Sequence, residues 1–397
     1  MVTVAEAEAI IQAEVKDFGV EVLPFERALG RVLAEDLRTD RDLPPFNRVA
    51  MDGIAIRYAA YAQGVRAFPI AATQAAGEEP IALQDAASCI EIMTGAALPA
   101  SADTVIRYED LTIANGTATV LAPEVAQGQN IHQQGKDRKR HDVVAKANQR
   151  VTPALVGMAA AVGATELQVK KLPRVVVIST GDELVEVQAS PLPYQIRRSN
   201  NYMVKAALQK YQLHADLLHI PDEVAATEQH LRECLQQYDV ILLSGGISMG
   251  KFDYVPQVLE TLAVERLFHK VQQRPGKPFW FGKHANGVLV FALPGNPAST
   301  FMCLHRYMLP WLDACLGMAS PQRHAALTQA VTFKPPLQYF LQVTLTVNEH
   351  GQLLATPLEG NGSGDFANLV EAEAFLELPQ HKTDFKEGEA YRVWTFR

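Results

Sequence analysis

The chain has 397 residues, 20% of which are charged, and a formal net charge of −8. This length predicts two to four domains, and the mixed acidic and basic residues argue against a nucleic-acid partner or a membrane surface. No apolar run is long enough to span a bilayer, and the first residues do not resemble a signal peptide. The four cysteines lack CxxC spacing, so we expect reduced thiols in a cytoplasmic protein.

The first 49 residues predict a short helical region that ends at a proline-rich connector. Apolar residues at helical spacing predict a helix over 3–17, where Thr3 and Glu6 have the spacing of a capping box. A second helix is expected over 25–33. The two prolines at 44–45 then prevent a helix and fix an extended connector, which marks a domain boundary.

Residues 50–125 change to short alternating segments, which predict a small β-barrel or sandwich with an Asn115-Gly116 hairpin turn. Asp52 and Thr94 lie beside glycines, and each motif taken alone favours a structural turn. A second helical stretch follows the β-rich part. We therefore expect a discontinuous helical domain, formed by residues 1–40 and 130–171, with a β-domain of residues 41–129 inserted into it.

The second half of the chain predicts an α/β domain followed by another β-domain. Strands and helices alternate through residues 172–320, which is typical of a mostly parallel sheet with helices on both faces. Asp222 is expected to cap one of these helices. Residues 321–397 return to short alternating strands and predict a small antiparallel domain. The expected fold class is a multidomain α/β plus β protein.

One strand and its loop, VILLSGGISMGKFD at 240–253, have the strongest signal for a ligand site. A continuous apolar run predicts a buried parallel strand, and ligands of open α/β sheets lie at the carboxyl ends of such strands. Glycines let the backbone approach a phosphate closely, and Asp253 is placed to bind a cation or accept a proton. The alternative is a tight turn followed by a helix cap. The loop contains Gly245, Gly246, Ser248 and Gly250.

Four loops of the α/β domain, at 180–183, 245–253, 274–278 and 294–299, are rich in glycine and polar residues. Hydroxyls and Lys277 suit phosphate, and the last loop places Ser299 in the first turn of a helix, among free N–H groups. Carboxylates suit a divalent metal or proton transfer. One such loop alone is more often structural, but four together indicate a site. None matches a Walker A or GxGxxG pattern. The carboxylates are Glu183, Asp222 and Asp253.

Several long motifs resemble the MoeA family of molybdopterin molybdenumtransferases, which is similar to the gephyrin E-domain. The resemblance covers nearly the whole chain. It rests on VAMDG (49–53), MTGA (93–96), ISTGDEL (178–184), LLSGGISMGKFDY (242–254), FHKVQQRPGKPFWFG (268–282) and FALPGNPAS (291–299).

The resemblance implies the last step of molybdenum cofactor synthesis. Adenylylated molybdopterin and molybdate would give molybdenum-molybdopterin and AMP, with help from a divalent cation such as Mg²⁺. It also implies an elongated helical first domain, a molybdopterin-binding α/β domain and a C-terminal β-barrel. The resemblance further implies an elongated homodimer whose active cleft takes residues from both subunits. A separate molybdopterin adenylyltransferase is a candidate partner.

The same resemblance implies roles for individual residues. Asp253, Asp222 and Glu183 would manage the metal and the attacking group, Lys277 would offset anionic charge, and Asp52 and Thr94 would reach in from the partner subunit. The implied pterin and phosphate contacts are Thr180, Gly181, Asp182, Ser199, Asn200, Gly245, Gly246, Ser248, Gly250, Arg274, Gly276, Pro294, Gly295, Asn296 and Ser299.

The C-terminal domain departs from the family pattern, which has arginines around an aromatic residue and a later serine near the oxyanion. The corresponding stretches are 337–342 and 370–372, where Glu371 would repel molybdate if it faced the cleft. Arg274 is expected to compensate. Two alternatives stay open: a non-catalytic pterin-binding paralogue or scaffold, and an adenylyltransferase that uses ATP.

Overall fold

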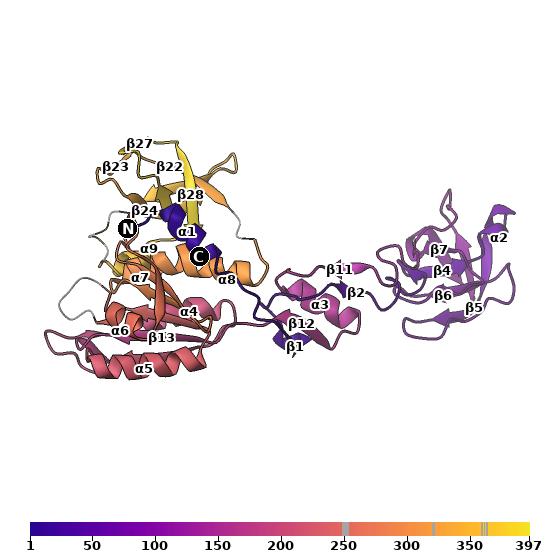
Figure 1. Ribbon diagram of the computed structural model, residues 1–397. Coiled ribbons are helices and arrows are strands. Elements are labelled where there is room, and N and C mark those ends of the chain that lie inside the picture. The colour runs from indigo at the N-terminus through magenta and orange to yellow at the C-terminus, as the bar shows by residue number, and fades with distance from the viewer. Residues whose placement is uncertain (248–253, 320–321, 359, 361, 363) are drawn as a thin grey trace.

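A computed structural model describes residues 1–247, 254–319, 322–358, 360, 362 and 364–397. Figure 1 shows a large body and a small distal body joined by a slender central segment. The chain begins in the large body, runs out along the central segment, builds the distal body, returns along the central segment and completes the large body. No helix in the described part of the chain is long and apolar enough to cross a membrane.

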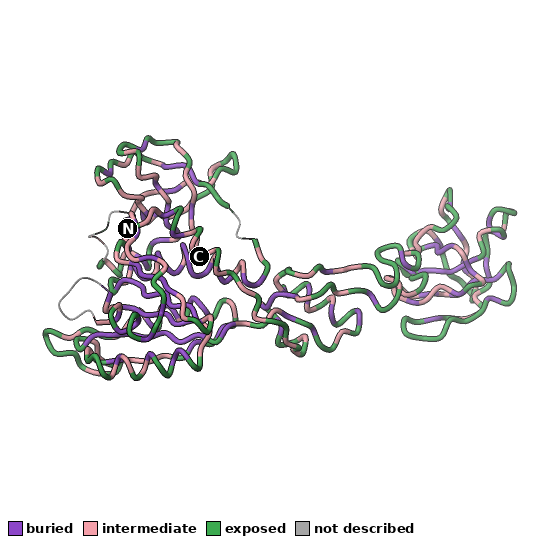
Figure 2. Tube along the Cα trace, in the orientation of Figure 1, coloured by how far each residue is buried: buried purple, intermediate pink, exposed green. Residues whose placement is uncertain are grey.

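The centre of the large body is a six-stranded sheet. Its first four strands run parallel, and β20 and β18 pair antiparallel at one side. Nearly every residue of the central strands is buried (Figure 2). The order is β16 (Ala215–Ile220), β13 (Val175–Thr180), β17 (Val240–Ser244), β21 (Leu289–Leu293), β20 (Trp280–His284), β18 (Val264–His269).

Alternate side chains of these strands pack against helices on opposite faces of the sheet. Val175 and Val177 share a core with α4 and the long helix α7–η3–α8, whereas Val176 and Ile178 share another with α5 and α6. This alternation is the period-two geometry of a strand that is buried on both sides. The helices are α4 (Asn200–Gln209), α5 (Val224–Gln237), α6 (Val255–Thr261), α7 (Pro297–Cys303), the π-helical turn η3 (Leu304–Met308) and α8 (Leu309–Cys315).

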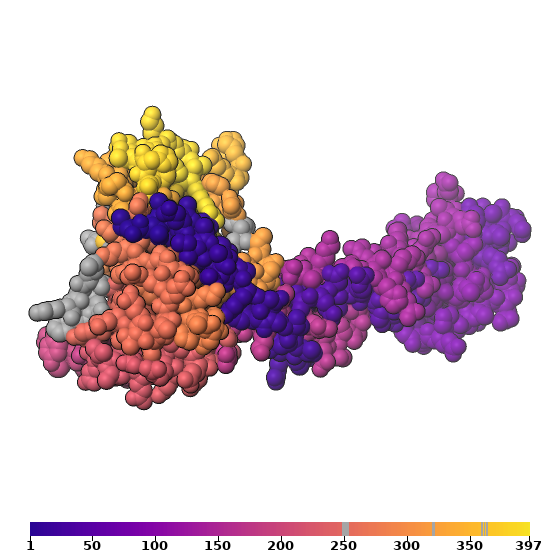
Figure 3. Space-filling view, in the orientation of Figure 1, coloured from indigo at the N-terminus to yellow at the C-terminus, as the bar shows by residue number. Residues whose placement is uncertain are grey.

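Helix α1 (Val4–Gln12) begins at the predicted Thr3–Glu6 capping box and ends before the predicted residue 17. Its apolar face lies in the same core as α8, and Glu8 contacts the buried Arg306 at 2.7 Å. Figure 3 shows this N-terminal segment lying across the junction of the α/β sheet and the C-terminal barrel. Residues 4–12 therefore pack in the large body, and the predicted domain boundaries stay predictions.

The central segment is built from short paired strands, one helix and a small core of its own. The predicted helix over 25–33 is wrong, since only η1 (Phe25–Arg27) forms. Gly30 takes a φ of +82°, and Val32 and Leu33 instead bridge to extended partners. The other elements are β1 (Val20–Pro24) with β12 (Glu166–Lys170), β2 (Leu37–Arg38) with β11 (Val143–Ala145), and α3 (Pro153–Ala161).

The distal body is a six-stranded sheet with a helix α2 (Tyr58–Ala62) and a turn η2 (Tyr108–Asp110). Asn115 and Gly116 both have positive φ between β8 and β9, so the predicted hairpin turn is confirmed. The strands in sheet order are β7 (Thr104–Arg107), β4 (Gly53–Ile56), β6 (Cys89–Ile92), β5 (Ala67–Gln74), β9 (Thr117–Val120) and β8 (Leu111–Ala114), while β3 (Arg48–Val49) pairs with β10 (Ile131–His132) nearby.

The C-terminal region closes into a five-stranded barrel, which confirms the predicted β-barrel, because β24 pairs with both β25 and β26. A short strand of the α/β domain, β19 (Gln273–Arg274), adds to β24 and joins the two parts. The barrel strands are β24 (Gln338–Val347), β25 (Leu353–Pro357), β22 (Arg323–Leu327), β28 (Ala390–Thr395) and β26 (Ala374–Leu378), with β23 (Val331–Thr332), β27 (Asp384–Phe385) and α9 (Ala367–Glu371) beside them.

The contact between the long helix and the barrel contains a histidine that should make stability depend on pH. The His305 ring packs against the Phe301 ring at a tilt of 52°, and its Nδ1 lies 3.0 Å from the Phe301 carbonyl. Burial lowers the pKa of His305 to about 4. Below about pH 6.5 the unfolded state therefore binds a proton on this histidine, whereas the folded state binds it only near pH 4. We expect the free energy of unfolding to fall by about 1–2 kcal/mol between pH 8 and pH 5, discounted because the ring borders a cavity.

Urea unfolding at the two pH values measures this loss. Tryptophan fluorescence is a suitable signal because all three tryptophans, at 280, 311 and 394, lie in the large body. His305→Gln should flatten the dependence, whereas the same change at the exposed His350 should leave it intact. An equal slope in wild type and His305→Gln would show that other groups control it.

Candidate active site

The four parallel strands end at one edge of the sheet, and the loops that follow them meet there. Ser179 is opposite Ser244, and Ser244 is opposite Leu293, so the strand ends are level. The chain places β16 on one side of β13 and then β17 on the other. This change of direction leaves a crevice between β13 and β17, where ligands of open α/β sheets bind.

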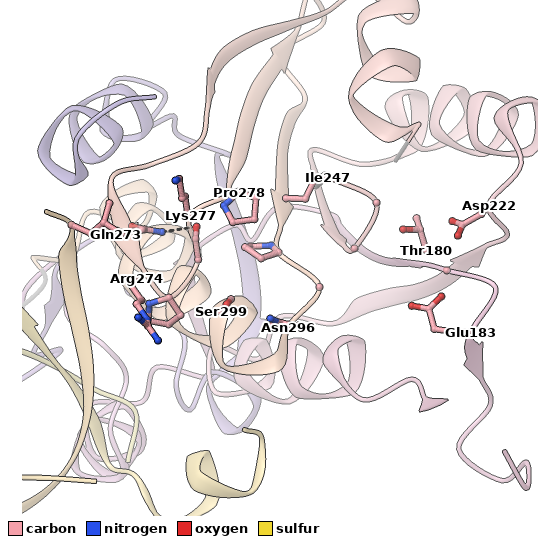
Figure 4. Close-up of a pocket in the computed structure, with 18 residues that line it drawn as sticks. Thr180, Glu183, Asp222, Ile247, Gln273, Arg274, Lys277, Pro278, Asn296 and Ser299 are labelled. Carbon is pink, nitrogen blue, oxygen red and sulfur yellow. Dashed lines mark hydrogen bonds between the residues drawn. The ribbon is translucent and has the colours of Figure 1, made fainter. Parts of the chain in front are cut away.

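A cavity of about 560 Å³ fills this crevice (Figure 4). All four loops that the sequence singles out contribute to it. From the predicted site it collects Thr180, Gly181, Glu183, Asp222, Gly245, Gly246, Arg274, Gly276, Lys277, Pro294, Gly295, Asn296 and Ser299.

A second cavity of about 400 Å³ lies beside the first and shares Thr180 and Gly245 with it. The predicted residues Ser199 and Asn200 line this one. The Asn200 side-chain amide donates to Ser244 Oγ at 2.8 Å and to the Gly295 carbonyl at 2.6 Å, which ties together two strand ends. Asn200 Oδ1 is buried and has no hydrogen-bond partner among the described residues, so it can accept a bond from a ligand.

The glycine pair after β17 lets the backbone approach Thr180. Gly245 and Gly246 have φ of +100° and +66°. A Cβ on Gly246 would lie 2.7 Å from Thr180 Oγ1 and 2.8 Å from Val255 Cγ2. A side chain at position 246 would therefore be strained by the positive φ and would collide with these two atoms. Thr180 Oγ1 is buried without a partner in the described chain, and its hydroxyl is available to a ligand. Ser248, Gly250 and Asp253 lie outside the described residues.

The loop after β21 leads into a helix as predicted. Asn296 is the N-cap residue, Pro297 is the first helical residue, and Ser299 follows in the first turn. Ser299 is 3% exposed and lines the cavity, so its hydroxyl and the free N–H groups of the helix start face the same space. Such a helix start attracts anions.

Opposite charges lie at opposite ends of the cavity. Arg274 ends β19 and Lys277 lies in the loop that follows, whereas Glu183 and Asp222 lie near Thr180 (Figure 4). Neither cation has an ion pair with another described residue, so both can neutralise a bound anion. Asp222 does not cap its helix as predicted, because Glu223 is the N-cap residue of α5. Its backbone N–H instead donates to Asp182 Oδ1 at 3.1 Å.

Two of the three predicted metal ligands lie among the described residues. Across the described ranges, no three histidine, cysteine or acidic residues gather closely enough to hold a metal ion. Glu183 and Asp222 line the cavity, and Asp253 lies outside the described residues. Two carboxylates beside a phosphate site nevertheless fit Mg²⁺, which commonly uses one or two protein carboxylates together with substrate phosphates.

Family models match three successive parts of the chain. They are the MoeA N-terminal region (domain I and II) at residues 2–163, a probable molybdopterin binding domain at 176–314 and the MoeA C-terminal region (domain IV) at 324–396. A molybdopterin molybdenumtransferase from Synechocystis is 39% identical over 399 residues and covers all of both chains. The chain belongs to the MoeA family.

Other relatives agree with this assignment. A molybdopterin molybdenumtransferase from Bacillus subtilis is 32% identical over 394 residues, which cover 95% of this chain and 90% of the relative. A solved structure described as a molybdopterin biosynthesis MoeA protein from Pyrococcus horikoshii has a TM-score of 0.83 and 26% identity and covers 100% of both chains.

In this MoeA-family chain, Asp52 and Thr94 lie together but far from the cavity. The Thr94 backbone N–H donates to Asp52 Oδ1 at 2.6 Å, and this bond lowers the pKa of Asp52. Both residues lie at turns of the distal body, beside β4 and β6, at the opposite end of the chain's long axis from the cavity (Figure 1). Within one chain they cannot reach the strand ends.

A small pocket of about 80 Å³ lies between the barrel and the α/β domain. Arg274 lines both this pocket and the main cavity, so its guanidinium is the cation that the two share. Gln342 and Asn368 contribute side-chain amides, joined by a 2.9 Å hydrogen bond. Glu371 is exposed and is absent from the described linings of these cavities.

The buried side chains beneath the loop that carries Lys277 were not predicted from the sequence. Gln273 is fully buried and bonds to the Gly276 carbonyl, yet a glutamine next to arginine gives no sign of burial. Its partner Tyr307 lies 34 residues later in an apolar helix. No local pattern connects two residues at that separation.

Proposed function

We propose that this protein inserts molybdenum into molybdopterin, using adenylylated molybdopterin and molybdate and releasing AMP. The observation that supports this proposal is the main cavity, where an anion-binding helix start and two cations lie opposite two carboxylates. A phosphoanhydride and an oxyanion need such an arrangement, since several negative charges must be brought together. The full-length similarity to molybdopterin molybdenumtransferases agrees with it.

Each group of residues in the site is assigned the role that suits its chemistry. Gly245, Gly246 and Ser299 would hold phosphate oxygens through N–H and hydroxyl groups. Lys277 and Arg274 would offset the charge of molybdate and of the phosphate oxygens as the phosphoanhydride bond breaks and AMP leaves. Glu183 and Asp222, together with Asp253, would hold Mg²⁺, which supplies charge neutralisation to the phosphates when bound. Thr180, Asn200 and Ser199 would contact the pterin or nucleotide in the adjoining cavity.

Molybdate would reach the reaction through the pocket beside the barrel. Arg274 supplies its positive charge, and the amides of Gln342 and Asn368 supply hydrogen bonds in place of the missing arginines. The exposed Glu371 does not line the described pocket, so the repulsion expected from a carboxylate facing the cleft does not argue against this proposal. A separate molybdopterin adenylyltransferase would deliver the adenylylated substrate. We place the insertion of molybdenum in the cytoplasm.

The deciding assay is AMP release from adenylylated molybdopterin with Mg²⁺, with and without molybdate. Release that requires molybdate is the expected result. Tight binding of the substrate without molybdate-dependent release would favour the non-catalytic paralogue instead.

A homodimer would bring Asp52 and Thr94 of one subunit to the cavity of the other, and this proposal predicts complementation. Asp52→Ala and Lys277→Ala should each be inactive as homodimers. A heterodimer of the two contains one site with both wild-type residues and one site with neither, so the purified heterodimer should have about half of wild-type turnover. Co-expression with two affinity tags and AMP release of the mixed species measure this. Absence of recovery in purified heterodimers would place Asp52 and Lys277 in the same chain's site, or Asp52 outside the mechanism.

A further inference from the structure

The loop that presents Arg274 and Lys277 is fastened at its tip by one buried side chain, Gln273. The backbone at both ends of the loop is already paired. Arg274 is opposite Tyr339 in the barrel, and the Val271 N–H donates to the Lys277 carbonyl at 2.9 Å. Between these ends, Gln273 Nε2 donates to the Gly276 carbonyl at 2.9 Å, as the dashed line in Figure 4 shows.

The tip is a close fit against the long helix beneath it. Gly276 has a φ of +88°, and a Cβ there would lie 2.8 Å from Cys303 Sγ and 2.9 Å from Gln273 Nε2. Cys303 is fully buried and contributes its sulfur 3.5 Å from Gln273 Nε2. Gly276 therefore packs directly on the side chains of Cys303 and Gln273, and a shift of Gln273 would move the backbone next to Lys277.

Tyr307 fixes the orientation of the glutamine amide. Its hydroxyl donates to Gln273 Oε1, and both side chains are buried. A tyrosine hydroxyl that donates to the oxygen leaves the amide N–H₂ group to face the Gly276 carbonyl. A glutamate at position 273 could accept from Tyr307 but could not donate to Gly276 when ionised. Burial also raises the pKa of Tyr307, which keeps the hydroxyl protonated as a donor.

We propose that Gln273 and Tyr307 form a positioning pair that sets where Lys277 meets anionic substrate. The proposal rests on the proposed function. Lys277 is exposed and has no ion pair within the described chain, so its backbone decides where its ammonium group can reach. Through the Gly276 carbonyl, the pair limits the motion of that backbone. Tyr307 does not occur among the described residues that line the cavity, so its proposed effect on Lys277 passes through Gln273.

Tyr307→Phe tests the pair, because it removes one hydroxyl and keeps the ring packing. Tyr238→Phe is the matched control, since its hydroxyl donates to Asp216 at 2.7 Å at the opposite end of β17. Hydrogen exchange of the Val271 amide, which donates to the Lys277 carbonyl, should become about tenfold faster in Tyr307→Phe and stay unchanged in the control. The KM for molybdate should rise by about tenfold, with kcat changed by less than about threefold.

Unchanged exchange of the Val271 amide, or an equal rise of KM in the control, would overturn the proposal. If Tyr307→Phe loosens the whole long helix, Gln273→Met replaces it, because this change keeps the volume and removes only the amide. Faster exchange confined to the loop in Gln273→Met would then support the pair, and exchange like wild type would refute it. Wild-type protein without molybdate-dependent AMP release would refute the proposed function, whereas the exchange comparison would still decide whether the pair fixes the loop.

Discussion

Lys277→Ala is expected to lower molybdate-dependent AMP release by about 100-fold or more, since a preorganised positive charge beside the reacting anions is lost. Lys277 is exposed at the rim of the cavity and makes no ion pair with another described residue. Its removal should therefore leave the free energy of unfolding nearly unchanged. The loss should appear in kcat/KM, measured with saturating adenylylated molybdopterin and varied molybdate.

Two variants separate charge from other effects. Lys277→Arg keeps the positive charge and should recover part of the activity, although a guanidinium has a different shape and set of donors. Lys171→Ala removes another exposed lysine, before β13 and so at the other end of the sheet, and should keep wild-type turnover. If Lys277→Ala retains more than about a third of wild-type kcat/KM, a phosphate or molybdate role for Lys277 is wrong.

The elements that sequence predicts well are those in which local pattern and burial agree. The residues at 240–243 are all apolar, so no polar side chain opposes their burial in the sheet. The run lies within β17. The Asn115-Gly116 turn needs positive φ at both residues, which these two residue types supply. At 25–33 the local pattern was misleading, because pairing of Val32 and Leu33 with distant segments outweighs helix propensity.

The candidate site was predicted where it consists of loops that follow strands. Topology alone brings such loops to one edge, so Thr180, Gly245 and Asn296 could be grouped before their distances were known. The support beneath the site could not be predicted, since Gln273 and Tyr307 meet only through the packing of a helix on a loop. The distance of Asp52 from the cavity likewise depends on how far the central segment extends.

Gly53→Ala is expected to unfold the distal body selectively. Gly53 lies in β4 between β6 and β7, and a Cβ there would lie 1.9 Å from the Ile106 carbonyl oxygen and 2.7 Å from Arg107 Cα. These are backbone atoms of a paired strand, so they cannot move aside without breaking the ladder. We expect a loss of about 3 kcal/mol or more in the stability of this body.

Thermal unfolding followed by tryptophan fluorescence should stay near wild type in Gly53→Ala, because the distal body contains no tryptophan. Hydrogen exchange over residues 53–56 and 104–107 should instead become much faster. Gly64→Ala is the control in the same body, since Gly64 has a φ of +99° with no atom within 4 Å of an added Cβ, and strain alone costs about 1 kcal/mol. Equal exchange in the two variants would mean that the sheet absorbs the added methyl group.

The same variant separates the fold of the distal body from its proposed part in catalysis. Asp52 precedes Gly53 directly, and its carbonyl accepts from the Tyr108 N–H at 3.1 Å, so the strand that excludes a Cβ also places the carboxylate. Asp52→Ala should lose turnover while the exchange of β4 stays slow, whereas Gly53→Ala should lose both. Full turnover in Gly53→Ala despite rapid exchange would show that an ordered distal body is unnecessary for the reaction, and the two-subunit site would then have to be abandoned.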